Sequence, residues 1–542
     1  MKAHFLFLVL SSMVCAATSR AEPADIIFAQ SAPSIETYDF VEIVLTVQKP
    51  DAANPFTDAT LDGRFGSVAG GGKNAVMGFC DSKDGSVFRI RFMPSSAGDY
   101  RYSLTYRQGA YQKTHEGSFR AEKSQRRGPI RVDSEHPWHF IWEGTGEHYF
   151  FNGTTAYYLM GWRDEKVIEA SIDRLHKLEV NRMRVQLSGR MSRMFGEPVM
   201  NGENFSVLLC PWPAERRDSF ERPGFDYTHF DISYWQRFER MLRMARERDM
   251  IISVVLNCND AQSDIGADTE NERRFIRYAL ARLSAFPNIT WDLGDDLDGF
   301  RDLKWIHQTG TYIHETDPYH HLATGHPMHI EPQDRGSEWV GFTSIQDWGR
   351  DQHNLMLSQR DVQKKSGRII PQANEEYGYE DHYPLWAPKP PGDSADTLRR
   401  VAWDIAMAGA YGTGAESCRR GTNIWPDTGG GWINGRGDDD MILFKLYGHM
   451  VHFLTGFAWW ETEPHDELVN YGAYCLAKPG SIYAVYLPKG GSVTLKLQPG
   501  TYHATWFNPR TGERTEVGEV NGDGWSSLNS PDADDWALQI LK

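Results

Sequence analysis

The sequence has few cysteines and no pattern that would pair them or bind zinc through them. Its 542 residues include six cysteines, and one of these, Cys15, lies in the N-terminal segment. The other five are odd in number, widely spaced and never form a Cys-x-x-Cys pair: they are Cys80, Cys210, Cys258, Cys418 and Cys475. Neither a zinc knuckle nor a disulfide framework is therefore indicated. The spacing is compatible with one bridge, and buried thiols are the default expectation.

Long apolar runs and concentrated positive charge are also missing. Beyond the N-terminus no segment approaches the roughly 20 apolar residues that a transmembrane helix needs, so we predict no membrane insertion. The formal net charge is −16 and no stripe of Lys and Arg interrupts it, so we predict no nucleic acid partner. With 40% hydrophobic and 24% charged residues, the composition is that of a folded protein.

The first residues have the pattern of an export signal. Lys2 and His4 precede an apolar run at 5–14, and small residues end at Ala21, where cleavage is expected. Val14 has the wrong size for a lipid-anchor signal at Cys15. We predict a signal peptide at residues 1–21 and a secreted or periplasmic protein.

The pattern of hydrophobic residues changes twice along the chain and predicts three domains. Residues 25–122 contain short alternating runs separated by turns rich in Gly, Asp and Pro, which is typical of an antiparallel β-sandwich. Residues 128–465 alternate strands with helices, and residues 466–542 return to β patterning, with strands expected at 481–487, 492–497, 501–507 and 536–541. We read the last part as a small C-terminal β-sandwich.

The middle region predicts a (β/α)8 TIM barrel. The clearest unit is 231–257, in which apolar residues fall at helical spacing from Trp235 to Ala245 and are followed by the apolar run 250–256 of a strand buried on both faces. Eight strands are expected, at 149–151, 181–187, 250–256, 288–293, 321–324, 339–345, 368–372 and 409–414. A doubly wound open sheet is the alternative, but no Gly-rich dinucleotide fingerprint follows any strand.

Two groups of acidic residues end opposite strands of this barrel. The segment 291–296 (Trp-Asp-Leu-Gly-Asp-Asp) ends the fourth strand and the segment 371–378 (Pro-Gln-Ala-Asn-Glu-Glu-Tyr-Gly) ends the seventh. Glycoside hydrolysis needs two carboxyl groups that face each other across the sugar, one to protonate the leaving oxygen and one to attack or to activate water. A single acid at a strand end is more often a helix N-cap or a solvated loop charge. The pair on two opposite strands favours catalysis.

These segments resemble a family. Trp-x-Leu-Gly-Asp-Asp resembles the Trp-x-x-Gly-Asn-Glu signature of clan A glycoside hydrolases, and is closer still to the Trp-x-x-Gly-Gly-Asp form of the apiosidase-like members. Residues 376–380 keep the Glu-x-x-Tyr-Glu spacing of that group. Residues 54–56, 78–79 and 91–94 resemble an uncharacterised N-terminal β-sandwich that is fused to such barrels, and residues 506–512 resemble a collagen-binding-like C-terminal domain.

The resemblance implies catalytic roles for two residues. Asp296 would be the acid/base and Glu376 the nucleophile of a double displacement, with the carboxyl groups about 5–5.5 Å apart. Asp296 would be kept protonated by an ionised Glu376 nearby and by partial burial. Asp295 stands where the family has Asn or Gly, so it is a substrate-binding candidate and a rival acid. Glu375 is a weaker rival to Glu376, because neighbouring strand residues point to opposite faces.

Other polar and aromatic residues near strand ends are candidates for binding substrate, each weighed against a purely structural role. They are Tyr157, Arg184, Asn257, His326, Gln346, Trp348, Glu416 and, in a Gly-rich loop that could cover the cleft, Trp425. For Arg184, the resemblance implies a hydrogen bond to the nucleophile, as the strand-two Arg of the clan makes, and an ion pair in the barrel core is an equally good account. Neither the histidines between 320 and 329 nor the three acids at 438–440 have the spacing of a zinc or calcium site, so we predict no metal and no cofactor.

The sequence thus predicts a secreted, retaining glycoside hydrolase that acts on a plant, algal or microbial polysaccharide or oligosaccharide. The 13% aromatic content fits carbohydrate binding, although aromatic residues also fill large cores. The alternative is a non-catalytic carbohydrate- or matrix-binding protein on a degenerate barrel. A polysaccharide lyase is a further alternative, but no Tyr/His or Lys base beside a uronate site is indicated.

Overall fold

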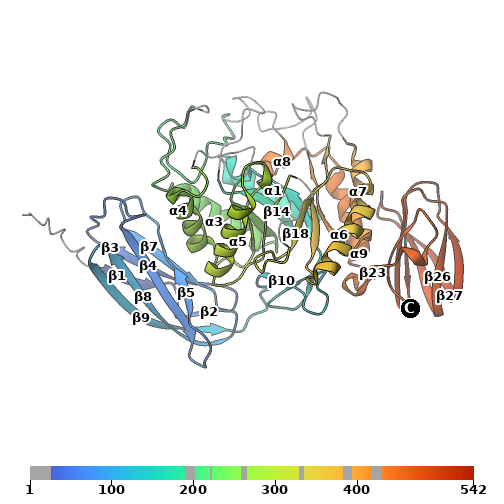
Figure 1. The fold of residues 1–542 in the computed structure, drawn as a ribbon, viewed down its shortest axis with the longest axis horizontal. Coiled ribbons are helices and arrows are strands. Elements are labelled where there is room, and N and C mark those ends of the chain that lie inside the picture. The colour runs from blue at the N-terminus through green and yellow to red at the C-terminus, as the bar shows by residue number, and fades with distance from the viewer. Residues whose placement is uncertain are drawn as a thin grey trace, which may run out of the picture.

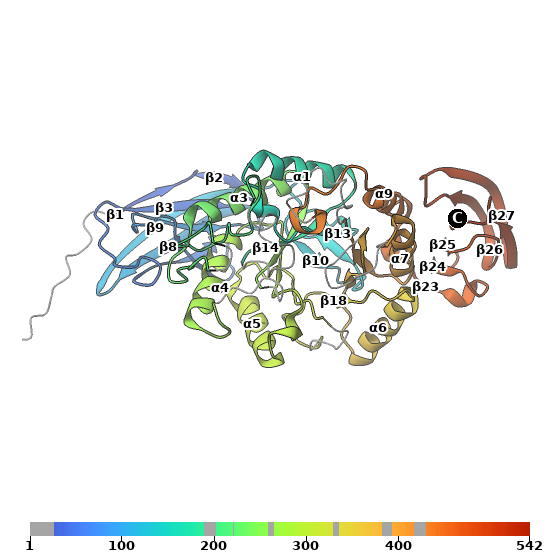
Figure 2. The same ribbon diagram turned by 90° about the horizontal axis from the view of Figure 1, so that it is seen from above.

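The computed structural model describes residues 26–188, 202–219, 222–257, 265–328, 335–381, 393–416 and 430–542. Three units follow one another along the long axis of the molecule: an N-terminal sandwich, a central barrel and a C-terminal sheet (Figure 1; Figure 2). The predicted signal peptide, Trp425 and two cysteines, Cys258 and Cys418, lie outside the described residues. Within the described ranges, no helix is long and apolar enough to cross a membrane.

The N-terminal unit is a sandwich of two sheets. One sheet has the order β1 (Ile26–Gln30), β3 (Val41–Val47), β7 (Val87–Phe92), β6 (Phe79–Cys80). The other has the order β2 (Ser34–Glu36), β9 (Tyr111–Glu122), β8 (Gly98–Gln108), β4 (Ala59–Ser67), β5 (Asn74–Met77). Alternate residues of β3, from Val41 to Val47, are buried between the sheets while those between them are half-buried, as the period of a strand requires.

The central unit contains eight parallel strands, as predicted for a TIM barrel. In chain order they are β13 (Asn152–Thr155), β14 (Arg182–Gln186), β15 (Ile251–Val255), β16 (Ile289–Asp292), β17 (Ala323–Thr324), β18 (Thr343–Gln346), β19 (Gln372–Glu376) and β21 (Tyr411–Thr413). A parallel bridge between Ala323 and Val340 joins β17 to the segment that enters β18 and closes the barrel. Strands β14 and β15 are buried along their whole length.

Two barrel strands differ from the predicted positions. The aromatic run at 149–151 is not the first strand, because His148–Tyr149 forms β12 of a separate small sheet with β10 (Ile130–Val132) and β11 (Phe140–Trp142). The first barrel strand follows it, at Asn152–Thr155. The seventh strand is β19, four residues later than expected, so Glu375 and Glu376 lie inside the strand and not after it. In both cases apolar residues that directly precede the strand were mistaken for the strand itself.

Helices surround the barrel and their sequences fit this position (Figure 2). Helix α3 (Ile232–Arg246) buries Trp235, Phe238 and Leu242 on one face, and the Asp231 side chain caps its first turn by accepting from two backbone amides. The other helices are α1 (Glu165–Lys177), α4 (Glu270–Leu283), α5 (Leu303–Thr316), α6 (Gln352–Ser366), α7 (Ala395–Met407), the short α8 (Gly431–Asn434) and α9 (Leu443–Leu454).

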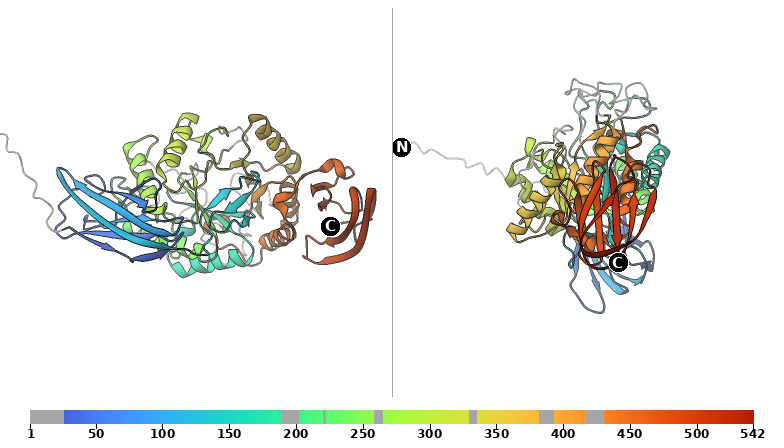
Figure 3. Two further views of the ribbon diagram at one scale, coloured as in Figure 1. Left: turned by 90° about the horizontal axis from the view of Figure 1, so that it is seen from below. Right: turned by 90° about the vertical axis from the view of Figure 1, so that its right-hand side faces the viewer.

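The C-terminal unit is a single antiparallel sheet of six strands, seen face on in Figure 3. Its order is β23 (Glu463–Pro464), β24 (Tyr474–Lys478), β25 (Ile482–Leu487), β28 (Trp536–Leu541), β26 (Ser492–Phe507), β27 (Arg514–Asn529). The two strands expected at 492–497 and 501–507 are one long strand, β26, which shifts register at Leu497/Gly500. Its partner β27 was not predicted, because most of its residues are polar or glycine.

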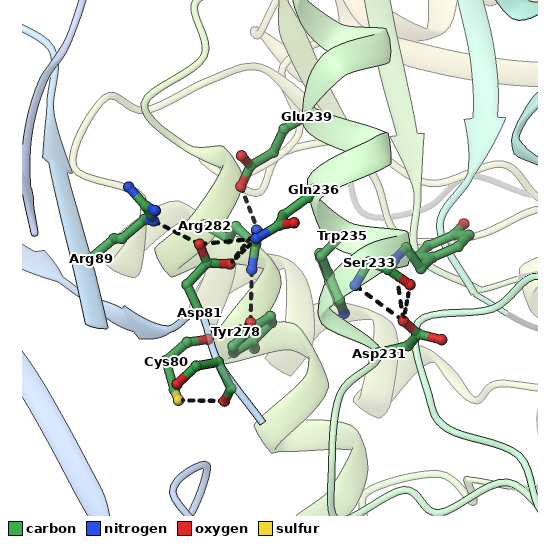
Figure 4. A network of polar contacts seen from close by, with 12 residues as sticks. Cys80, Asp81, Arg89, Asp231, Ser233, Trp235, Gln236, Glu239, Tyr278 and Arg282 are labelled. Atoms are coloured by element: carbon green, nitrogen blue, oxygen red, sulfur yellow. Dashed lines mark hydrogen bonds and ion pairs between the residues drawn. The ribbon is translucent and has the colours of Figure 1, made fainter. Parts of the chain in front are cut away.

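Buried charged residues attach the N-terminal sandwich to the barrel (Figure 4). Asp81, at the end of β6, forms ion pairs with Arg89 of its own unit (2.6 Å) and with Arg282 of α4 (2.8 Å). Arg91 of β7 donates two hydrogen bonds to the carboxylate of Glu239 on α3, at 2.8 and 2.9 Å. Because these charges are removed from water in pairs, loss of one partner leaves an uncompensated buried charge.

Candidate active site

The turn after β16 brings two acidic residues to the carboxyl end of the barrel. Gly294 begins this turn, and a Cβ atom there would lie 2.9 Å from the carbonyl oxygen of Asn257, so only glycine fits without a shift. Asp296 has a φ of 52°, in the left-handed region that Asp tolerates better than most residues. The close approach and the left-handed turn explain the Gly-Asp-Asp sequence at this strand end.

Asp295 is surrounded by donors from three other strand ends. Its Oδ1 accepts from the Tyr157 hydroxyl (2.6 Å) and from Arg184 Nη2 (2.9 Å), and it lies 2.9 Å from His326 Nδ1. Burial alone would raise the pKa of Asp295, but Arg184 and His326 outweigh it and hold this pKa well below its usual range. Asp295 is therefore ionised at neutral pH.

Arg184 is the central cation of the site. It is fully buried, donates to the Tyr157 hydroxyl (3.0 Å) and to Asp292 Oδ2 (3.1 Å), and lies 3.6 Å from Glu375 Oε2. Although burial opposes it, the neighbouring acidic groups raise the pKa of Arg184 well above its ordinary value. The expected hydrogen bond to Glu376 is absent from its contacts in the structure, since Arg184 is occupied by Asp295 and Asp292.

The neighbouring acids Glu375 and Glu376 have opposite environments. Glu375 is fully buried and accepts from Arg182 (2.8 Å) and Thr413 (2.9 Å). Burial would raise its pKa, but Arg182, Arg184 and His326 together outweigh burial and lower it. Burial first, then the negative charges of Asp295 and Asp296, raise the pKa of Glu376 to about 8. With this pKa, Glu376 holds a proton at neutral pH, whereas we expected it to be ionised.

Glu376 and Asp296 each have a polar neighbour that positions the carboxyl group. The Tyr379 hydroxyl hydrogen-bonds Glu376. Gln346 lies at the end of β18, and its side-chain amide satisfies its neighbours when the nitrogen, and not the oxygen, faces them. In that orientation the nitrogen donates to Asp296 Oδ1 (2.8 Å) and to the carbonyl oxygen of Pro327 (3.2 Å). Gln346 was a candidate from the sequence, whereas Tyr379 was recognised only as part of a motif spacing.

Aromatic rings lie beside these carboxyl groups. Tyr379 is stacked with Trp432 of α8 (ring centroids 5.5 Å apart) and meets Trp348 edge-on (5.3 Å), and Trp432 meets Tyr157 edge-on (6.1 Å). We call these four residues the aromatic wall. Sequence analysis did not select Trp432, and the only signal for it was its place in the Gly-rich stretch after the last strand.

Three side chains predicted to bind substrate are not placed by the structure in the group around the Asp295 and Glu376 carboxyl groups. Two of them contact other protein groups, and the third lies outside the described residues. The carbonyl oxygen of Asn257 accepts from the Asp295 amide (3.0 Å) and its side chain donates weakly to Leu293, so Asn257 supports the turn after β16. Glu416 forms a bidentate pair with Arg174 of α1 (2.8 and 2.9 Å). Trp425 lies in the segment 417–429, which the structure does not describe. A substrate contact of these residues stays a prediction.

Three side chains of the site could serve as metal ligands, but the charges around them favour acid/base catalysis over metal binding. One ligand atom from each of Asp295, Asp296 and His326 lies within 4.8 Å of the others. However, Arg184 already supplies a positive charge next to Asp295, and it would repel a divalent cation. Carboxyl groups with opposed pKa shifts are the arrangement that acid/base and nucleophilic catalysis requires.

Comparison with protein families gives three matches along the chain. Residues 176–416 match the model described as "Apiosidase-like, catalytic domain", residues 34–107 match a domain of unknown function (DUF5060), and residues 465–541 match the "Putative collagen-binding domain of a collagenase". A comparison with curated proteins gives no significant match.

Solved structures share the fold. A "putative glycoside hydrolase" from Bacteroides vulgatus has 21% sequence identity and a TM-score of 0.78, with 94% of this chain and 100% of that one covered. A glycoside hydrolase family 5 protein from the same organism has 17% identity and a TM-score of 0.58, with 77% and 93% covered. The family matches confirm the resemblance that the sequence motifs predicted, and the structure matches show that the chain shares the fold of these proteins.

Proposed function

We propose that the chain is a secreted, retaining glycoside hydrolase in which Glu376 attacks the anomeric carbon and Asp296 serves as general acid and then as general base. The observation that carries this proposal is electrostatic: the charge of Asp296, at the end of the fourth barrel strand, raises the pKa of Glu376 on the seventh. Two carboxyl groups from opposite sides of the barrel therefore interact at one end of it, where barrel enzymes have their active sites.

The environment of Asp295 argues against a role as the acid. Three groups face its Oδ1, and one of them, Arg184, is permanently charged. A carboxylate held in this way has no proton to give, and its engaged oxygen is a poor nucleophile. Asp295 is better suited to fix Arg184 and His326 at the floor of the site, which leaves Asp296 as the proton donor.

The mechanism depends on one proton that Asp296 and Glu376 share. The charge of Asp296 is one of the causes that raise the pKa of Glu376, so ionisation of one carboxyl group opposes ionisation of the other. In the reactive form Asp296 holds it: Glu376 attacks, the glycosidic bond breaks, and the leaving oxygen takes the proton from Asp296. Water, deprotonated by Asp296, then hydrolyses the glycosyl-enzyme and restores Glu376. We expect a carboxyl separation of about 5–5.5 Å, as in retaining enzymes.

The aromatic wall supports a carbohydrate substrate. Tyr157, Trp348, Tyr379 and Trp432 lie around the carboxyl groups, and aromatic faces of this kind bind the apolar faces of sugar rings. Together with the export pattern of the N-terminus, this supports an extracellular or periplasmic enzyme that acts on plant, algal or microbial glycans.

Chemical rescue would test the roles of the carboxyl groups. A panel of activated aryl glycosides and glycans first identifies a substrate, and NMR of the first-formed sugar reports retention. With the aryl glycoside, azide should rescue Asp296→Ala to a glycosyl azide of retained configuration and Glu376→Ala to one of inverted configuration. Asp295→Asn is the matched control and should give no azide product.

Three results would overturn the assignment. Rescue of an Asp295 variant in place of the Asp296 variant would transfer the acid role, and a directly inverted product would exclude double displacement. Binding of glycans without any hydrolysis, unchanged by Glu376→Gln, would instead support a non-catalytic carbohydrate-binding protein.

A further inference from the structure

A second group of ligand-type side chains lies at the opposite end of the barrel from the proposed active site. Asp133 and His136 belong to the loop between β10 and β11, and His148 begins β12, just before the chain enters the first barrel strand. One ligand atom from each lies within 4.8 Å of the others. Catalytic side chains come from the carboxyl ends of the barrel strands, whereas this group precedes the amino end of β13.

The three side chains converge on one point. Asp133 Oδ2 lies 2.9 Å from His136 Nδ1 and 2.8 Å from His148 Nε2, so two imidazole nitrogens aim at the same carboxylate oxygen. The other carboxylate oxygen, Oδ1, accepts from the backbone amide of Glu135 (2.8 Å), which fixes the carboxylate plane. We propose that Asp133, His136 and His148 form a binding site for a divalent transition-metal ion of the zinc type.

The donor set determines the class of ion. Two imidazoles and one carboxylate suit Zn²⁺ and its neighbours in the first transition row, whereas Ca²⁺ and Mg²⁺ prefer a shell of oxygens. The Asp133 side chain is nearly buried, while those of His136 and His148 are 31% and 16% exposed. An ion can therefore enter from solvent, and water can complete a tetrahedral shell. Its binding requires the two contacts between Asp133 and the histidines to open by roughly half an ångström, because ligand atoms about 2.0–2.2 Å from a tetrahedral ion lie roughly 3.3–3.6 Å from one another.

Neighbouring groups hold the ligands in orientation. The His148 ring is stacked on Trp460, with ring centroids 3.9 Å apart and planes 6° apart. Trp460 belongs to η3 (Trp459–Glu461), which leads to the first strand of the C-terminal sheet. A bound ion would thus join the β10–β11 loop to His148 at the start of β12. Through the stacking of His148 on Trp460, it would also support the segment between the barrel and the C-terminal sheet. We expect it to stabilise the fold without taking part in the reaction.

The chain contains an internal control for this site. Asp226 and His229 repeat the Asp-x-x-His spacing, and His229 Nδ1 lies 2.6 Å from Asp226 Oδ2. Among the residues that the structure describes, however, no third ligand-type side chain lies close to Asp226 and His229. The local hydrogen-bonded unit is the same, so a difference in metal binding between the two places must come from the third side chain.

Metal titration of the full chain tests the proposal. The protein is treated with a chelator, dialysed, and titrated with Zn²⁺ by calorimetry, and Co²⁺ is added separately so that its visible spectrum reports the coordination number. We expect one equivalent of tight binding, a higher Tm in Zn²⁺, and a four-coordinate Co²⁺ spectrum. His136→Gln and His148→Gln should each weaken binding at least tenfold and remove the Tm increase, while His229→Gln leaves both unchanged.

The outcomes separate this site from the active site. Absence of stoichiometric Zn²⁺ binding, or binding that survives in both His136→Gln and His148→Gln, would overturn the proposal, because the ion would then bind elsewhere. Circular dichroism of each variant shows whether it is folded before binding is measured. The glycosidase assignment does not depend on the result, since Asp296 and Glu376 lie at the other end of the barrel.

Discussion

Replacement of Glu376 by Gln should abolish hydrolysis and yet stabilise the protein at alkaline pH. The folded protein keeps a proton on Glu376 up to about pH 8, because burial and the charges of Asp295 and Asp296 oppose ionisation. The unfolded chain releases that proton near the ordinary value of about 4.5. Since the folded-state pKa is the higher one, this residue stabilises the fold at low pH, and the contribution is lost as pH rises to about 8.

The size of the effect follows from the shift in pKa. One pKa unit corresponds to about 1.4 kcal/mol, and no discount for solvent is needed because Glu376 is only 8% exposed. Between about pH 5.5 and about pH 9 the wild-type free energy of unfolding should fall by roughly 3 kcal/mol through this residue. Gln cannot ionise, so the stability of Glu376→Gln relative to wild type should rise by the same amount over that interval.

Glu375→Gln is the matched control. The pKa of Glu375 is lowered because Arg182, Arg184 and His326 together outweigh burial. Its contribution to stability is therefore present above its ordinary pKa and constant between about pH 5.5 and about pH 9. Removing its charge leaves Arg182 buried without its partner and should cost about 3–5 kcal/mol at both pH values.

The assay is denaturant or thermal unfolding of wild type and both variants at the two pH values. The quantity to compare is the difference between each variant and the wild type, so that titration of all other groups cancels. If the difference for Glu376→Gln is the same at both pH values, Glu376 is ionised in the folded protein, and the description of a shared proton is wrong.

Three further predictions concern the site and the interface of the domains. Asp295→Asn should move the alkaline limb of the kcat/KM profile, expected near pH 8, to lower pH, because one of the charges that retain the shared proton is removed; an unmoved limb would contradict this. Tyr379→Phe should lower kcat about 10–100-fold with little change in KM, since a hydrogen bond to the nucleophile is lost; an equal rise in KM would indicate a substrate-binding role. Arg91→Ala should cost about 3–5 kcal/mol of unfolding free energy, because its buried partner on the barrel loses its counter-charge, whereas the exposed Arg107→Ala should cost less than about 1 kcal/mol; equal Tm changes in the two variants would refute this.

The architecture was predictable because periodicity differs between strands and helices. The buried run that became β15 and the amphipathic pattern of α3 were both found at the predicted places. The errors concern strands whose residues do not follow the simple pattern. The aromatic residues 149–151 are as apolar as a barrel strand but lead into the bottom of the barrel, and β27 is polar because it lies at the edge of its sheet.

The sequence predicted which residues of the candidate site lie at strand ends. It did not predict which of these residues contact one another. Sequence analysis placed Arg184 and Asp295 at the mouth of one barrel, yet only the structure shows that they pair with each other. The proton on Glu376 and the stacking of Trp432 on Tyr379 depend on distances between elements far apart in the chain. The same is true of His148, which lies far enough from Asp133 in sequence that no local motif joins them.

The acid at position 295 determines how the whole site is charged. The Asn or Gly that stands there in the resembling families would be neutral, so Arg184 would lack its closest buried counter-ion and would be available to Glu376. With Asp295 present, Arg184 pairs with it, His326 gains a partner that raises its pKa despite burial, and Glu376 gains a repelling anion. After burial, Asp295 is thus the largest cause of the raised pKa of Glu376. It follows that the enzyme should work at a higher pH than relatives with a neutral residue at this position, because its two catalytic carboxyl groups keep their shared proton longer as pH rises.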